Sequence, residues 1–455
     1  MGRKKGKNSP HRKMILQTLS KNSIIRKYLE LEKEIGKRNE EIERLKKELR
    51  KYKNSNTPPS AHQHLKQNVS RTIGVKQHNR GAPVGHRGTT RPKKETNDSN
   101  HIISEECPNC HSKDINVIGE KHQQQEEIPS EIELKVVNIT RDVCKCNKCH
   151  LKFIARDGAT PIQGKFGINL MVIIIFLKFI VRGVLRKTTC FLDASFAIKL
   201  APATVQAIIE RAAKAGEKEY ETLKNKIKAA RLLYIDETSF SVLGKNWWVW
   251  AFRSDTDLLI IIRKSRGSNV LEEILGKDYA GTVICDCWRA YDFLINATIQ
   301  RCWAHLLRKS AEIKSIAGRH FDKKLHELFE EIVKFNCKER TDKARMRKYK
   351  QMTAKLQKLI AYYGRYGECR ETVKYIDFHI EQWFTCIKIA GVQPTNNYAE
   401  QAIRESVLVR KIIGAFRSEK GPKIYETLAS LIATWQYQKL DVKKELNRVL
   451  SVNLC

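Results

Sequence analysis

Leu232-Leu-Tyr-Ile-Asp236 decides the fold, because four apolar residues lead directly into a carboxylate. Two more apolar, β-rich runs follow, Trp247–Phe252 and Leu258–Arg263, with polar turn residues between the three. Such runs predict strands, and their close succession predicts a meander. After an expected helix over Ser268–Leu275, Gly281-Thr-Val-Ile-Cys-Asp286 is another strand that ends in a carboxylate. We therefore expect an α/β layout here.

Asp236 and Asp286 would lie side by side at the ends of two strands of one sheet. Mg²⁺ prefers oxygen ligands, and two metal ions about 3.5 to 4 Å apart can clamp both oxygens of a phosphodiester displacement. Glu400 is a candidate third acid, in the early turns of a helix that Asn396 would cap. A strand-end aspartate is also a common turn former, and Glu400 with Arg404 is also a common surface pair.

The composition points to a polyanionic partner. Lys and Arg number 85 against 50 Asp and Glu, a formal net charge of +35, which favours nucleic acid. Hydrophobic residues make up 41% of 455 residues, enough for roughly two to four folded domains. The longest apolar run, Leu170–Leu177, is far shorter than the ~20 residues that span a bilayer. The N-terminus lacks the apolar core of a signal peptide, so we expect a cytoplasmic, nucleoid-associated protein with no membrane partner.

The N-terminal region predicts a tethered coiled coil. Apolar residues recur at 3,4 spacing over about four heptads, typical of self-association into a homodimer or a higher oligomer, or of a helix packed on its own chain. They are Tyr28, Leu31, Ile35, Ile42, Leu45, Leu49 and Tyr52. From Asn54 to Asn100 no aromatic residue occurs and basic residues outnumber acidic ones eight to two. This stretch predicts a disordered linker, either a plain spacer or one that lies along phosphates.

Two C-x-x-C hooks predict a structural zinc ion. Cys107 and Cys110 form the first, and Cys146 and Cys149 form the second. Four thiolates from two tight turns are the ligand set of a tetrahedral zinc site, and a redox pair is the alternative. Cys144, His111 and His150 are nearby substitutes. Alternating Ile132, Leu134, Val136 and Val137 between the hooks would form the strands of a zinc ribbon.

The segment after the hooks reads as helical. A helix, a turn near Lys199 and a second helix that starts at Pro202 could form a helix-turn-helix that reads the major groove, although ordinary helical packing is the preferred interpretation. From about Leu306 to Ile389 the chain predicts charged amphipathic helices without a catalytic constellation.

Several motifs together resemble the insertion-sequence sixty-six family of DDE transposases. They are Tyr-Ile-Asp236-Glu-Thr, Val-Ile-Cys-Asp286-Cys-Trp-Arg-Ala-Tyr, Arg301-Cys-Trp-Ala-His305 and Asn396-Asn-Tyr-Ala-Glu400, with Arg410-Lys411 and Phe416–Gly421 behind them. The resemblance covers nearly the whole chain, and the coiled coil, Pro-Pro-Ser linker and zinc segment come in the family's order. Gln401 and Cys287 depart from the family pattern, where a basic residue and a glycine are common.

The resemblance implies a multidomain α+β/α protein whose catalytic core is RNase H-like, with a helical insertion before the final acid. We divide the chain into a basic arm and coiled coil (1–53), a basic disordered linker (54–105), a zinc-binding ribbon (106–155), a helical segment with a possible helix-turn-helix (160–228), the first part of the core (229–305), a helical insertion (306–392), core-closing helices with the catalytic glutamate (393–440) and a tail (441–455).

The implied activity is DNA cutting and joining at the ends of a mobile element. Asp236, Asp286 and Glu400 would hold two Mg²⁺ ions; water would cut at an element end, and the exposed 3′ hydroxyl would then attack target DNA. Expected contacts to double-stranded DNA come from Arg263, Arg266, His305, Arg404, Arg410 and Lys411. The same element could encode accessory proteins. The alternatives are a non-enzymatic zinc-ribbon DNA-binding protein and an RNase H-like nuclease that hydrolyses without joining.

Overall fold

The computed structural model describes residues 134–455 without a gap. Upstream it describes 30–32, 34–36, 38–42, 44–45, 99, 102, 105–106, 108–114, 116, 118–119 and 122. The chain divides into two compact units, Met1–Glu133 and Leu134–Cys455.

The described residues between 30 and 45 are helical, as the heptad pattern predicts. Leu31, Ile35, Ile42 and Leu45 are each 46 to 56% exposed. Their apolar stripe therefore stays open to a partner, and self-association remains a prediction. Tyr28, Leu49, Tyr52 and most of the linker lie outside the described residues.

The second hook lies in a short hairpin. Strands β1 (Val143–Lys145) and β2 (Lys152–Ile154) pair antiparallel on either side of it, with Cys144 opposite Phe153. The strands expected at Leu134, Val136 and Val137 are absent: residues 134–142, all of them described, have no regular structure, and these three side chains are exposed. Alternation alone supplies no neighbouring strand for the backbone hydrogen bonds, so it overpredicted structure here.

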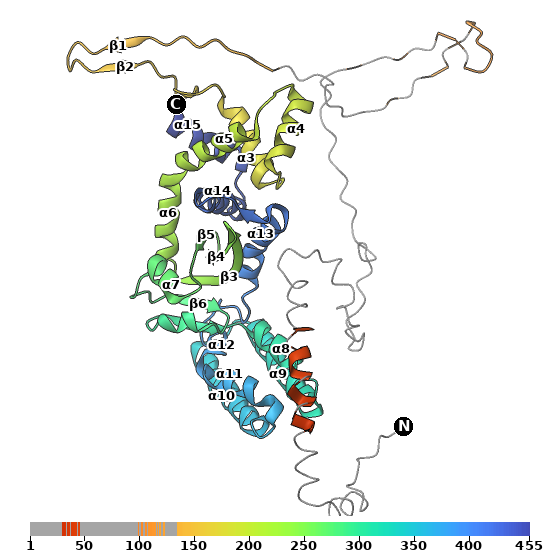
Figure 1. Cartoon of the computed structure of the whole chain (residues 1–455), viewed down its shortest axis with the longest axis vertical. Coiled ribbons are helices and arrows are strands. Elements are labelled where there is room, and N and C mark those ends of the chain that lie inside the picture. The colour runs from red at the N-terminus through yellow and green to blue at the C-terminus, as the bar shows by residue number, and fades with distance from the viewer. Residues whose placement is uncertain are drawn as a thin grey trace, which may run out of the picture. The chain divides into compact units, whose positions relative to one another are not determined.

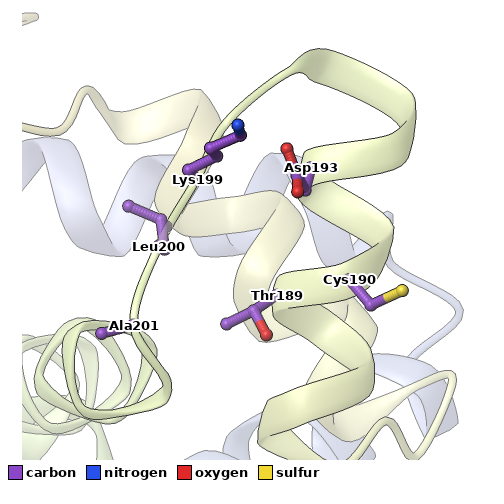
Figure 2. A pocket seen from close by; sticks show the side chains of 6 residues that line it. All are labelled: Thr189, Cys190, Asp193, Lys199, Leu200 and Ala201. Atoms are coloured by element: carbon purple, nitrogen blue, oxygen red, sulfur yellow. The ribbon is translucent and has the colours of Figure 1, made fainter.

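Four helices follow the hairpin. They are α3 (Ile168–Phe179), α4 (Leu185–Phe196), α5 (Pro202–Ala215) and α6 (Glu217–Lys228). The turn between α4 and α5 and the start at Pro202 match the sequence expectation. Helix α5 buries Val205, Ile208, Ile209 and Ala212 in the core, so most of its apolar face packs inside the protein. Figure 2 shows a pocket beside this turn, lined by Thr189, Cys190 and Asp193 of α4 and by Lys199, Leu200 and Ala201.

A mixed sheet forms the centre of the second unit. Its strands run in the order β5-β4-β3-β6-β7, where β3 is Leu232–Val242, β4 is Lys245–Arg253, β5 is Leu258–Arg263, β6 is Thr282–Cys285 and β7 is Thr298–Arg301. The first three pair antiparallel, while β6 pairs parallel to β3 and to β7. The short β8 (Ala415–Phe416) pairs parallel to the far end of β3. Helix α7 (Ser268–Leu275) occupies the predicted residues.

The sequence suggested that strand β3 ends at Asp236, but the strand is longer. It continues through Val242 because β4 pairs with it along its length, from Tyr234 opposite Arg253 to Val242 opposite Lys245. Leu243 and Gly244 both take positive φ at the hairpin turn, which suits the twist of antiparallel strands. Asp236 is therefore anchored within a paired strand rather than in a turn.

Alternation along β3 assigns its side chains to two faces. Leu233 and Ile235 pack in a core with α6 and α7, whereas Tyr234 packs in a second core with the start of helix α13. Because side chains alternate, Asp236 shares the face of Tyr234. That face carries α13 (Asn397–Ile413), which contacts β3 and β4 (Figure 1).

The edge strand β5 is closed by a helix. Helix α14 (Lys420–Tyr437) offers one oxygen every four residues: Leu258 N donates to Thr434 Oγ1, Ile260 N to Ser430 Oγ and Ile262 N to Glu426 Oε1, at 3.0, 2.8 and 2.9 Å. Four helical residues rise about 6 Å and two strand residues about 6.6 Å, so the two spacings match. The β5 edge is thereby protected from pairing with another chain.

The remaining helices form the insertion and the C-terminus. The insertion contains α8 (Trp303–Ala311), α9 (Ile316–Asn336), α10 (Asp342–Tyr363), α11 (Arg370–Asp377) and α12 (Thr385–Lys388), with a core of its own around Trp303 and Trp383. The region 441–455, which the sequence division names a tail, contains helix α15 (Val442–Leu454). Within the described residues, no helix has the length and apolar character to cross a membrane.

Candidate active site

Strand register sets the two aspartates next to each other. Leu232 pairs with Thr282 and Tyr234 with Ile284 in the parallel β3–β6 pair. The paired residues end there, but Asp286 is close enough for its charge to contribute to the raised pKa of Asp236. Asp286 follows directly after β6, and its Oδ1 accepts the backbone N–H of Trp288 at 2.8 Å. The proximity expected from two strand carboxylates is therefore present.

Asn396 ties the helix of Glu400 to the same strand. Its fully buried side chain donates from Nδ2 to the carbonyl oxygen of Ile235 at 2.7 Å, one residue before Asp236. Glu400 N donates to Asn396 O at 3.0 Å, so Glu400 lies in the first turn of α13. Asn396 is the N-cap by position, but its side chain makes no cap hydrogen bond to the described residues. The Asn396 amide instead bonds to strand β3, so the capping role expected from the sequence is wrong.

The three acids share one electrostatic environment. The pKa of Asp236 is raised to about 8, first by burial and then by the charges of Glu237, Asp286 and Glu400. Asp236 is therefore protonated at neutral pH in the absence of a cation. The three carboxylates are not all within 4.8 Å of one another; the one such group of possible ligands in the described part of the chain is Cys302, His305 and Glu400.

Two arginines contact the carboxylates of Asp286 and Glu400. Arg308 Nη2 donates to Glu400 Oε1 at 2.6 Å, and Arg266 Nη2 lies 3.8 Å from Asp286 Oδ2. Arg266 also lies over the rings of Trp248 and Trp288, at 4.8 and 4.1 Å from their centroids. Guanidinium groups thus provide positive charge at two of the three carboxylates.

Glu237 lies on the opposite side of β3, as alternation predicts. Its side chain is fully buried, accepts from the Tyr291 hydroxyl at 2.6 Å and pairs with Arg266 at 2.8 Å. Burial, and then the charge of Asp286, raises its pKa. Through Arg266 it connects indirectly to Asp286, and it is a positioning residue rather than a ligand of the triad.

The expected DNA contacts divide into two groups. Arg263 pairs with Glu273 and Glu426 at 2.6 and 2.9 Å, and Arg410 is buried and bonds to Ser239 on β3. Both have structural partners, because a strand carbonyl and a buried carboxylate each require a donor. Arg404 and Lys411 on α13 are exposed. These two remain free to meet phosphate.

His305 lies at the rim of the triad. Its Nδ1 is 3.6 Å from Glu400 Oε1, and its Nε2 is 3.3 Å from Arg308 Nη2. Burial, and then the charge of Arg308, lowers its pKa. The imidazole is therefore neutral at pH 7 and can accept a proton.

Sequence reasoning missed three residues of the site. Arg308 faces Glu400 from α8, and Cys302 Sγ accepts the backbone N–H of Asn396 at 3.1 Å. Fully buried Arg301 donates to the carbonyl oxygen of Asp286 at 2.7 Å and pairs with Asp292 at 2.6 Å. The position of Arg301 at the end of a short strand, directly before the Cys-Trp-Ala-His motif, was a usable clue for Arg301, and the His305-x-x-Arg308 spacing on one helix face was a clue for Arg308.

The two cysteine hooks share one local shape. The three residues that end at Cys110 and at Cys149 form turns, and His111 and His150, each directly after its hook, take positive φ of 56° and 59°. The backbone N–H groups of Cys149 and Lys148 lower the pKa of the Cys146 thiol, which favours the thiolate that zinc requires. Cys107 lies outside the described residues.

Comparison with known proteins identifies the family of this chain. The family model described as the Transposase IS66 family matches residues 163–424, which include all three acids. A relative from Sinorhizobium fredii (strain NBRC 101917 / NGR234), described as uncharacterized protein y4hP, is 23% identical over 431 residues, which cover 84% of this chain and 76% of the relative. Because the family match spans more than half of its length, this chain belongs to the IS66 family of transposases.

Proposed function

We propose that this protein binds the ends of an insertion sequence and catalyses metal-dependent strand cleavage and strand transfer as a DDE transposase. The observation that carries the proposal is the convergence of Asp236, Asp286 and Glu400 from β3, β6 and α13. The raised pKa of Asp236 supports this closeness, since the charges of Asp286 and Glu400 both contribute to the raised pKa. A carboxylate cluster beside unpaired basic side chains suits phosphoryl transfer.

The sheet supports an RNase H-like core. Three antiparallel strands are followed by two parallel ones in the order β5-β4-β3-β6-β7, and the helical insertion separates β7 from the helix of the last acid. In this arrangement Asp236 sits on the central strand β3, and Asp286 follows its neighbour β6. The proposed fold therefore holds Asp236 by strand pairing in the middle of the sheet, with Asp286 directly after the neighbouring strand and Glu400 on helix α13.

The acids fit a pair of Mg²⁺ ions by their chemistry. Three carboxylates offer only hard oxygen donors, and Arg266 and Arg308 already supply positive charge at Asp286 and Glu400. When bound, the ions supply Lewis-acid stabilisation of the attacking and leaving oxygens. Asp236 releases its proton as the site fills, because a cation nearby lowers the pKa of a carboxyl group.

The chain's other residues position DNA and protons. Arg308 is 59% exposed at its side chain and can turn from Glu400 to a phosphate oxygen once Glu400 is engaged. Arg404 and Lys411, on the same helix as Glu400, add charge along the strand to be cut. Neutral His305 can take up the proton that water or the 3′ hydroxyl releases.

A second surface for DNA lies on the insertion. The α10 basic stripe, defined as Lys343, Arg347, Lys350 and Lys358, is exposed, and none of the four pairs with an acid that the structure describes. The other lysines of the helix, Lys348 and Lys355, are instead held by Glu331 of α9. Their spacings of 4, 3 and 8 residues keep them on one side of the helix, and exposed cations in such a row suit a phosphate backbone. We assign this stripe to sequence-independent DNA contact.

The remaining modules have roles that follow from their chemistry. The hooks Cys107-x-x-Cys110 and Cys146-x-x-Cys149 would hold one structural Zn²⁺, a role supported by the turns and thiolate-favouring N–H groups described above. The exposed stripe of the N-terminal helix would assemble two copies, since joining requires two DNA ends in one complex. The ends would be recognised by the zinc segment, by the helices after it or by the basic linker, with accessory proteins of the same element as further partners.

The decisive experiment uses the purified full chain, Mg²⁺ and a labelled duplex that carries one element end, with target DNA present. Asp236→Ala, Asp286→Ala and Glu400→Ala are compared with the wild type for cleavage, joining and DNA binding. Cleaved and joined products that vanish in all three variants, while binding persists, establish the proposal. Cleavage without joining would identify a nuclease, and DNA binding without any product would mean a non-enzymatic DNA-binding protein, an inactive copy or a missing accessory protein.

A further inference from the structure

Cys302, His305 and Glu400 form a cluster of different chemistry beside the triad. Their possible ligand atoms all lie within 4.8 Å of one another. Cys302 is fully buried, while the side chains of His305 and Glu400 are 28 and 33% exposed. The thiol thus forms the base of the cluster, and the imidazole and carboxylate open it to solvent. We propose that these three side chains bind one Zn²⁺ ion and so withdraw Glu400 from the Mg²⁺ site.

The donor set selects the metal. A thiolate, an imidazole and a carboxylate are ligands of zinc sites that keep a fourth position open, whereas Mg²⁺ takes oxygen ligands. Tetrahedral bonds of about 2.0 to 2.3 Å set ligand atoms roughly 3.3 to 3.8 Å apart. His305 Nδ1 and Glu400 Oε1 already lie at 3.6 Å. The widest separation needs a closure of about 1 Å, which side-chain rotation supplies.

Two further observations fit a metal ion at this cluster, since no hydrogen bond holds the His305 Nδ1 proton in place and the Cys302 sulfur is already oriented. His305 Nδ1 is buried and has no hydrogen-bond partner among the described residues, although buried polar atoms are normally paired. Cys302 Sγ accepts the backbone N–H of Asn396 at 3.1 Å, an outer contact that orients a metal-bound sulfur. On binding, the Cys302 thiol gives its proton to solvent, and the sulfur donates its electron pair to the metal.

Arg308 now occupies the place of such a cation. Its Nη2 lies 2.6 Å from Glu400 Oε1 and 3.3 Å from His305 Nε2. Since Arg308 can only donate, Nε2 accepts and the ring proton sits on Nδ1. Zinc at Nδ1 requires that proton to move to Nε2, which removes the Arg308 contact to the imidazole, and zinc then competes with Arg308 for Glu400 Oε1. Metal binding and the Arg308 contact therefore exclude each other.

The exclusion gives two variants with opposite effects. Cys302→Ser keeps an acceptor for Asn396 N but removes the soft ligand, so the metal should be lost. Arg308→Ala removes the competing cation, so the metal should bind about 10-fold more tightly. His305→Gln is a second loss variant at a partly exposed position, which keeps the test valid if the buried Cys302→Ser protein folds poorly.

The test is a Co²⁺ titration of the full chain without DNA, followed by the sulfur-to-cobalt charge-transfer band. The hook cysteines contribute equally to every variant, so the difference from wild type isolates this cluster. We expect one fewer Co²⁺ equivalent with Cys302→Ser and with His305→Gln, and tighter binding with Arg308→Ala. Equal stoichiometry and equal band intensity in the wild type and the Cys302→Ser variant would overturn the inference.

A second arm connects the site to activity and rests on the proposed function. Zn²⁺ added to Mg²⁺-dependent cleavage should inhibit the wild type at least about 10-fold more strongly than Cys302→Ser, relative to each protein's own uninhibited rate. Equal inhibition would show that zinc does not act through Cys302. The cobalt titration needs no DNA, so a failure of the transposase proposal would leave its result readable.

Discussion

Asp236→Asn should stabilise the metal-free protein, and increasingly so as pH rises. The pKa of Asp236 is about 8 in the folded chain, chiefly because the carboxyl is buried, against about 3.9 in an unfolded chain. The unfolded state therefore releases this proton first, and stability is lost as pH rises from about 4 to about 8. Asparagine has the same shape and no proton to lose.

The magnitude follows from the two pKa values. Ionisation of the unfolded state costs the wild type about 1.5 kcal/mol at pH 5. At pH 8 the cost is about 5 kcal/mol once the half-ionisation of the folded state is subtracted, so the advantage of the variant should grow by up to about 3.5 kcal/mol over that range. Urea unfolding followed by tryptophan fluorescence measures it at each pH, in buffer without Mg²⁺. Asp278→Asn, at an exposed aspartate, is the matched control.

One outcome would refute this reasoning. If the stability difference between Asp236→Asn and wild type is the same at pH 5 and pH 8, Asp236 ionises normally and the acids do not crowd together. Mg²⁺ provides an independent check: it should stabilise the wild type at pH 8 more than the variant, since a ligand that binds only the folded state adds to its stability. Equal stabilisation would remove Asp236 from the metal site.

Three further predictions test how the site is held and how DNA is bound. Asn396→Ala should destabilise the protein by about 1 to 3 kcal/mol, because it leaves Ile235 O unpaired. The same variant should lower cleavage more than DNA binding. Unchanged urea unfolding and cleavage would show that the Asn396–Ile235 hydrogen bond does not hold α13 on the strand. Ser430→Ala should lower the free energy of unfolding by about 1 to 2 kcal/mol, because Ile260 N loses its buried partner. The control Thr222→Ala, at an exposed threonine of α6, should change it by no more than about 0.5 kcal/mol. Equal urea midpoints for the two variants would argue against edge closure by α14. Glutamine at all four positions of the α10 basic stripe should reduce the slope of log K for DNA binding against log salt concentration by up to about 3.6. An equal reduction with glutamine at the exposed residues Lys214, Lys218, Lys226 and Lys228 would show that the stripe has no special role.

The sequence by itself indicated the family and most strands of the central sheet, and it singled out the acids that remain a proposal. The apolar run Leu258–Arg263 and the helix Ser268–Leu275 appear at the predicted residues, because long periodic or apolar runs carry their own structure. The motifs around Asp236 and Glu400 indicated the family, and the match over residues 163–424 confirmed it. Features that depend on residue type and on the order of neighbouring residues could therefore be predicted from the sequence.

Tertiary structure decided how those acids are placed and what accompanies them. Asp236 lies within β3 rather than at its end because β4 pairs beyond it, and pairing partners are distant in sequence. Asn396 bonds to β3 instead of capping its helix, and Arg308 reaches Glu400 from a helix 92 residues away in the chain. Such contacts cannot be read from periodicity, because each depends on which buried polar atom needs a partner once the sheet and its helices have packed.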